Sequence, residues 1–77
     1  MKKIEILGTG CSKCKALYRN VEKAVSELSL ECDLEKVEDI EKILDYGVMV
    51  TPCLVIDGKV VSSGKLLTVG DVKKMLS

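Results

Sequence analysis

The sequence contains no histidine, tryptophan or phenylalanine, and only one proline. With two tyrosines as its only aromatic residues, it must build its core from Val, Leu, Ile, Met and Ala. Of its four cysteines only Cys11 and Cys14 lie close together in the sequence, so there is no second close pair. Structural zinc uses four ligands, usually as two close pairs, so the composition argues against such a site. Hydrophobic residues make up 47% and charged residues 31%, which is typical of a globular domain that folds alone.

Long apolar runs are absent as well. None approaches the roughly 18 residues that would cross a bilayer. The start, MKKIEILGTG, is too short and too acidic for a signal peptide. We therefore expect a cytoplasmic protein with no membrane partner.

Charge of one sign is not in excess, because 12 basic and 12 acidic residues cancel. The charges are nevertheless segregated: residues 1–26 carry a net +4, residues 27–45 a net −6 and residues 46–77 a net +2. A zero total with so few aromatic residues gives little support for nucleic-acid binding. We interpret the acidic run 27–45 as a solvated face, with a docking surface for a basic partner as the alternative.

The length of 77 residues predicts one domain, residues 1–77, that buries about 60–65% of the surface of its unfolded chain. No internal repeat, low-complexity segment or linker interrupts it. We expect this domain to act as a monomer.

Hydrophobic periodicity predicts the order βαβαββα. Apolar residues recur at helical spacing from Cys14 to Leu28, which indicates a helix over about 12–28 with Cys14 on its buried face. Shorter helices are predicted over about 38–46 and 68–76, the first stopped by Gly47 and the second capped by Thr68 and Asp71. The predicted strands cover residues 3–7, 30–35, 52–56 and 59–63, with an Asp57-Gly58 hairpin turn between the last two.

Right-handed crossovers make the first two strands parallel neighbours, and the hairpin adds two antiparallel strands. The sequence thus predicts an α/β fold with a four-stranded mixed sheet covered by helices. If the first strand lies between those of Cys32 and Cys53, these two residues stand about 9–10 Å apart, two strand spacings. We therefore predict no disulfide between them, since Cα atoms must lie within about 7 Å.

The stretch GTGCSKCK places Cys11 and Cys14 directly after the first strand. A cysteine just before a helix meets unpaired backbone amides and the positive end of the helix dipole, so the pKa of Cys11 should fall. Lys13 and Lys15 act in the same direction. Cys14, one turn further on, should be shielded and suited to attack a mixed disulfide formed by Cys11.

Other roles for the two cysteines stay open at this point. They could be inert core residues, or they could bind a soft metal, copper(I) or zinc, and for copper(I) two thiolates suffice. They could also regulate, through their redox state, the binding of partners by an interaction module that has no catalytic turnover. GTG before a helix is a weak phosphate-loop signal without the remaining residues of that motif.

The ordered set GTGC-SK-CK, YGVMVTP and LVIDGKVVSSG resembles the small thioredoxin-like and glutaredoxin-like redox-active disulfide proteins of archaea and bacteria, over nearly the whole chain. The resemblance implies a thioredoxin fold and a thiol-disulfide oxidoreductase with no cofactor. It implies Cys11 as nucleophile and Cys14 as resolving thiol, and a cis proline at Pro52. The backbone of Thr51 would pair with the substrate. The expected partners are a disulfide-containing protein or small thiol substrate and a reductase.

The segment around the cysteines departs from that of typical thioredoxins, with Gly10 before Cys11 and Ser12-Lys13 between the cysteines. Residues 62–65 replace the Gly-Gly segment with which glutaredoxins bind glutathione. Thioredoxins keep a buried carboxylate six residues before the first cysteine, and Glu5 has that spacing. Glu5 is hence a hypothetical acceptor for the Cys14 proton, with a solvated strand glutamate as the commoner outcome.

Two further features are interpreted from local chemistry. Cys53 is most simply a small buried hydrophobe, or else a third exchanging thiol. Gly8 and Gly10 are expected to let the chain turn tightly past the thiols, and Gly64 to allow a close approach beside the site.

Overall fold

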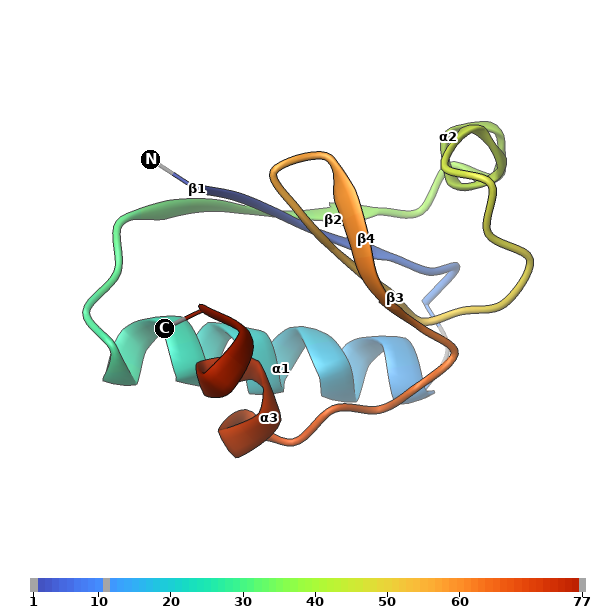
Figure 1. Ribbon diagram of the computed structural model, residues 1–77. Helices are drawn as coiled ribbons and strands as arrows, with labels where there is room; N and C mark the ends of the chain where they lie inside the picture. Colours follow the sequence, from blue (N-terminus) through green and yellow to red (C-terminus); the bar gives the residue numbers. More distant parts are fainter. Residues whose placement is uncertain (1, 11, 77) are drawn as a thin grey trace.

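A computed structural model describes residues 2–10 and 12–76 of the protein, and Figure 1 shows the arrangement of its elements. In chain order they are β1 (Lys2–Leu7), α1 (Ser12–Glu27), β2 (Cys32–Val37), α2 (Ile40–Asp45), β3 (Cys53–Ile56), β4 (Lys59–Ser63) and α3 (Val69–Leu76). The predicted order βαβαββα is confirmed. No helix in the described part of the chain is long and apolar enough to span a membrane.

The four strands form one mixed sheet in the order β2-β1-β3-β4. β1 pairs in parallel with β2 and antiparallel with β3, and β3 pairs antiparallel with β4. This is the predicted topology, with β1 between the strands of Cys32 and Cys53. The hairpin turn is formed by Asp57 and Gly58, whose positive φ angles of 51° and 80° suit a tight two-residue connection.

α1 and α3 cover one face of the sheet, whereas α2 lies on the other side (Figure 1). The apolar stripe of α1 that the sequence predicted packs against the sheet face covered by α1 and α3. Leu17, Val21 and Ala24 of α1 are fully buried against Ile4 and Ile6 of β1. A smaller cluster of buried residues occupies the α2 face, formed by Leu7, Val37, Ile43, Val48, Cys53 and Val55. Alternate residues of β1 therefore face two separate cores.

The helix ends explain why one predicted boundary is wrong. The prediction began the second strand at Leu30, but β2 begins at Cys32. The amide of Leu30 donates to the carbonyl of Val25 (3.1 Å), and Ser29 has a φ of 53°. This geometry is that of a helix C-terminal motif closed by a left-handed residue, so Leu30 belongs to the end of α1.

The other caps agree with the sequence. Thr68 and Asp71 exchange the two hydrogen bonds of a capping box, at 3.1 and 3.3 Å. Gly47 follows α2 with a φ of 77°. Asp39 caps the start of α2 by accepting a hydrogen bond from the amide of Glu41 (2.9 Å). That helix is shorter than predicted and covers only six residues.

Candidate functional site

Of the two predicted exchanging cysteines, Cys14 lies in the first turn of α1, just after the connection from β1. β1 ends at Leu7, Gly8 to Gly10 follow, and α1 starts at Ser12. Gly10 has a φ of 91°, a left-handed conformation that side-chain-bearing residues rarely adopt. Cys11, the predicted nucleophile, lies outside the described residues. Ser12 and Lys13, the two residues between the cysteines, are exposed at the start of α1.

Cys14 lies one turn into α1 and is only 5% exposed, which confirms that it is part of the buried stripe. Its side chain contacts Gly8. A Cβ built on Gly8 would stand 3.0 Å from the Cβ of Cys14 and closer still to its sulfur. The φ of Gly8, unlike that of Gly10, lies outside the left-handed region. Gly8 therefore lets the chain pass close to the thiol by leaving space for it, and not through a left-handed backbone conformation.

Thr51 and Pro52, the predicted substrate-pairing segment, lie beside the same glycine. The Cβ position on Gly8 is 3.9 Å from the Cβ of Thr51. The Thr51–Pro52 peptide bond is cis, and Pro52 is buried whereas Thr51 is half-buried. The end of β1 thus brings together Cys14 and Thr51, which are 37 positions apart in the sequence.

Two hydrogen bonds hold the segment around Pro52. The Cys53 thiol donates to the carbonyl of Val50 (2.7 Å), and the amide of Gly64 donates to the carbonyl of Pro52 (2.8 Å). A Cβ on Gly64 would lie 3.0 Å from Cγ2 of Val50, so the close approach expected at Gly64 is present. The two residues before Thr51 are exposed to solvent: Met49 is 95% exposed and Val50 53% exposed.

A small cavity of about 10 Å³ adjoins Cys14. Its lining includes Gly8 and Gly10 together with three charged residues, Lys15, Lys36 and Glu38. In the sequence, Lys36 and Glu38 are part of the acidic run 27–45, and nothing else there marks them as site residues. The signal that could have identified them is the parallel pairing of β1 with β2, because the carboxyl ends of parallel strands meet at the same edge of a sheet.

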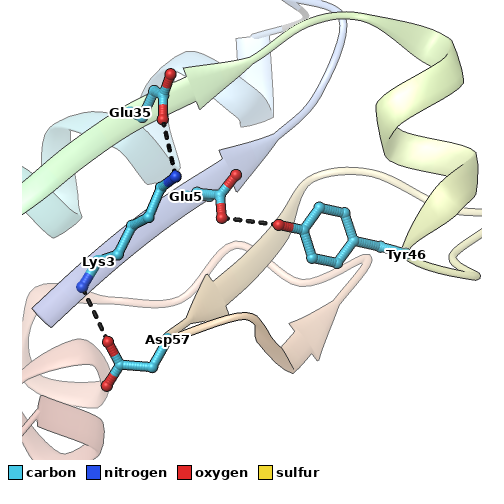
Figure 2. A network of polar contacts seen from close by, with 5 residues as sticks. All are labelled: Lys3, Glu5, Glu35, Tyr46 and Asp57. Atoms are coloured by element: carbon cyan, nitrogen blue, oxygen red, sulfur yellow. Dashed lines mark hydrogen bonds and ion pairs between the residues drawn. The ribbon is translucent and has the colours of Figure 1, made fainter.

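Glu5 lies on the opposite side of β1 from Cys14. Its neighbours in the strand, Ile4 and Ile6, face α1, and the Tyr46 hydroxyl donates to its carboxylate (2.7 Å; Figure 2). Glu5 is only 8% exposed, so the expected solvated glutamate is wrong. That Glu5 accepts the Cys14 proton stays a hypothesis, and the hydrogen-bond partner found for its carboxylate is Tyr46, on the α2 side of the sheet.

Tyr46 was not singled out by the sequence. Its hydroxyl is a donor to Glu5, and this hydrogen bond is the main cause that raises the pKa of Tyr46. Burial raises it further. Around this pair, Lys3 forms an ion pair with Glu35 (3.8 Å), and its backbone amide donates to Asp57 (3.0 Å; Figure 2).

The two remaining cysteines have separate places. Cys32 is half-buried beside the α1-side core, and Cys53 is fully buried in the α2-side core. Burial raises the pKa of both thiols. β1 lies between their strands, as predicted, and no disulfide joins the two residues. Among residues 2–10 and 12–76, no group of three or more Cys, Asp or Glu side chains could hold a metal ion. A two-thiolate copper(I) site would include Cys11 and falls outside this range.

Known proteins resemble the chain over its length. The family model of the thioredoxin domain matches residues 2–77. A thioredoxin of Methanothermobacter thermautotrophicus is 38% identical over 77 residues, which is 100% of both chains. A thioredoxin of Methanocaldococcus jannaschii is 42% identical over 73 residues, covering 95% of this chain and 84% of the relative. A probable thioredoxin of Methanothermobacter marburgensis is 36% identical over 62 residues, or 75% of this chain and 73% of the relative.

The fold, with its mixed sheet and its helices on both faces, agrees with these matches. The chain belongs to the thioredoxin family and is a thiol-disulfide oxidoreductase.

Proposed function

We propose that Cys11 and Cys14 are the exchanging dithiol, with Cys11 as the nucleophile and Cys14 as the resolving thiol. The observation that carries this proposal is the position of Cys14. Its side chain is 5% exposed, one turn into a 16-residue helix and beside Gly8 and Thr51. A thiol so shielded reacts poorly with substrates from solution but well with a disulfide formed on the adjacent turn.

The exchange proceeds in two steps. The Cys11 thiolate attacks one sulfur of a substrate disulfide and forms a mixed disulfide, and the departing substrate thiolate takes up a proton. Cys14 then loses its proton and attacks the Cys11 sulfur, which forms the Cys11–Cys14 disulfide and releases the second substrate thiol. Two electrons pass to the substrate, and a reductase must then supply two electrons to reduce the Cys11–Cys14 disulfide again. All electrons move between sulfur atoms, so these steps require no cofactor.

Helix α1 supports the first step. A residue directly before a helix lies where backbone amides lack intrahelical partners and the dipole is positive, which favours a thiolate. The first turn of α1 contains no acidic residue to oppose this, while Lys13 and Lys15 are exposed nearby.

The segment before β3 supports substrate binding. We propose that an extended stretch of the substrate pairs with the backbone of Thr51 beside Pro52. Exposed Met49 and Val50 would supply apolar contact, while the hydrogen bonds to the carbonyls of Val50 and Pro52 hold the segment in place. The proposed substrates are disulfides of proteins or of small thiols. The proposed setting is the cytoplasm, with the chain acting as a single monomeric domain.

Reduction of a protein disulfide such as insulin, with dithiothreitol as electron source, tests the assignment. Cys11→Ser should abolish turnover. Cys14→Ser should also stop turnover and, when the reduced variant is mixed with insulin without dithiothreitol, leave a mixed disulfide on Cys11 that mass spectrometry detects. Cys32→Ser serves as the matched control and should keep wild-type activity, since Cys32 lies on the edge strand β2. Full activity of Cys14→Ser would contradict the proposal.

A further inference from the structure

We propose that Gly8 is a positioning residue for the second step of exchange, because its missing side chain leaves the space that the Cys14 sulfur occupies. The inference rests on the proposed role of Cys14 as resolving thiol. A Cβ on Gly8 would overlap that sulfur and stand 3.0 Å from the Cys14 Cβ. Real Cβ atoms almost never approach a neighbour so closely, so one of the two groups would have to move.

The backbone of Gly8 cannot easily move. Gly8 is buried, and its amide donates to the carbonyl of Val37 in β2 (3.0 Å). The preceding residue, Leu7, is fully buried and pairs with Val37 on one side and Cys53 on the other. A shift of Gly8 would therefore break contacts with both neighbouring strands.

The position of helix α1 is also fixed, by its apolar packing against the sheet. Leu17, Val21 and Ala24, which continue the stripe of Cys14, are fully buried against β1. Close-packed interiors tolerate little displacement. A methyl group on Gly8 would consequently displace the most mobile atom at the contact, which is the sulfur of Cys14.

Displacement of that sulfur should slow the attack on the mixed disulfide, because the attack requires an aligned approach to the Cys11 sulfur. A misplacement on the order of 1 Å can cost about 100-fold in rate. The first step uses Cys11 and should change much less. Gly8 thus acts on the resolving step through Cys14, without touching the substrate.

Single-turnover reaction with dithiobis(nitrobenzoic acid) separates the two steps, because each releases one coloured thiolate. We would use a Cys32→Ser background to remove the half-exposed thiol. Gly8→Ala should slow the second release about 10- to 100-fold and leave the first within about twofold. The matched control is Gly70→Ala in α3, where the closest atom to a new Cβ, apart from the adjoining residues and the helix backbone, is Oγ1 of Thr68 at 3.8 Å. It should leave both releases unchanged.

A double-mutant cycle covers the case in which Gly8→Ala folds poorly. Gly8→Ala should reduce the folding equilibrium constant at least tenfold more in the presence of Cys14 than in a Cys14→Ala background, where no sulfur remains to collide. Recovery of folding only in the double variant would also support the inference. An equal loss in both backgrounds, or failure of both to fold, would overturn it, because Gly8 would then act independently of the thiol.

The outcomes also separate this inference from the proposed function. If the wild type shows no second release that depends on Cys14, the dithiol assignment fails. If the wild type shows both releases and Gly8→Ala shows the same two rates, the dithiol assignment stands and the role of Gly8 is refuted.

Discussion

The two faces of the sheet are covered differently. On one face, α1 and α3 have 16 and eight residues and enclose a continuous apolar cluster. On the other, α2 has six residues, and its Ile40 and Leu44 are 60% and 58% exposed. The thinner face also contains a buried carboxylate, that of Glu5.

This difference indicates that the two faces contribute differently to stability and to substrate binding. Cys14, the proposed resolving thiol, belongs to the well-packed face, where its helix is fixed by apolar contacts. The segment around Pro52 is instead fixed by individual hydrogen bonds, one of them from Cys53 in the core of the α2 face. Loss of apolar packing should therefore affect mainly stability, while loss of polar contacts beside β3 should affect substrate binding.

Removal of a large side chain from the well-packed face should have the largest effect. Leu17→Ala deletes a fully buried side chain and should lower the free energy of unfolding by about 2–5 kcal/mol. The matched change on the thin face, Leu44→Ala, should cost less than about 1 kcal/mol because Leu44 is already exposed. Urea denaturation measures both. Equal losses would show that the two faces contribute equally.

Tyr46→Phe should have the next largest effect, since it leaves the buried Glu5 carboxylate without its hydroxyl donor. The expected loss is about 1–3 kcal/mol. Tyr18→Phe is the control, because the ring of Tyr18 contacts Nζ of Lys36 (4.8 Å to the centroid) and no hydrogen bond of its hydroxyl is found among the described residues. If the two variants lose the same free energy, the Glu5–Tyr46 contact does not stabilise the α2 face.

Substitution of Cys53 tests whether the core on the α2 side holds residues 50–52, the proposed substrate-binding segment, in place. Cys53→Ala removes the donor to the Val50 carbonyl and should raise KM for a disulfide substrate about 2- to 10-fold, as expected from a hydrogen bond of roughly 0.5–1.5 kcal/mol. Cys53→Ser keeps a donor and should stay closer to the wild type. An equal KM for both variants would show that the hydrogen bond is dispensable.

The smallest expected effect is on the pH dependence of stability. The pKa of Tyr46 is raised in the folded state, so the unfolded chain loses this proton first as pH rises. Stability should then be intact below about pH 10, the ordinary tyrosine value, and fall as pH approaches the folded pKa. Tyr46→Phe should lose stability less steeply over this range. Identical slopes in alkaline urea titrations would argue against the effect.

The fold was predictable because its signals are local. Helical spacing from Cys14 to Leu28 defines α1, and a capping box defines the start of α3, without reference to the rest of the chain. The burial of Cys14 follows from the same spacing. Where two local signals competed, the prediction was wrong: Leu30 alternates like a strand residue but is used to close α1.

The parts that could not be predicted depend on contacts between distant segments. Glu5 is buried because Tyr46, 41 positions away, supplies a hydroxyl, and nothing near Glu5 indicates this. The space beside Gly8 likewise results from packing of α1 on β1. A glycine required for close approach cannot be distinguished in the sequence from one required for a turn.

A redox titration with dithiothreitol, followed by alkylation and peptide mapping, tests the central assignment most directly. We expect a reversible Cys11–Cys14 disulfide, with a potential in the roughly −120 to −270 mV range of known oxidoreductases, while Cys32 and Cys53 stay reduced. Absence of this disulfide, or a reversible one that includes Cys32 or Cys53 in its place, would contradict it.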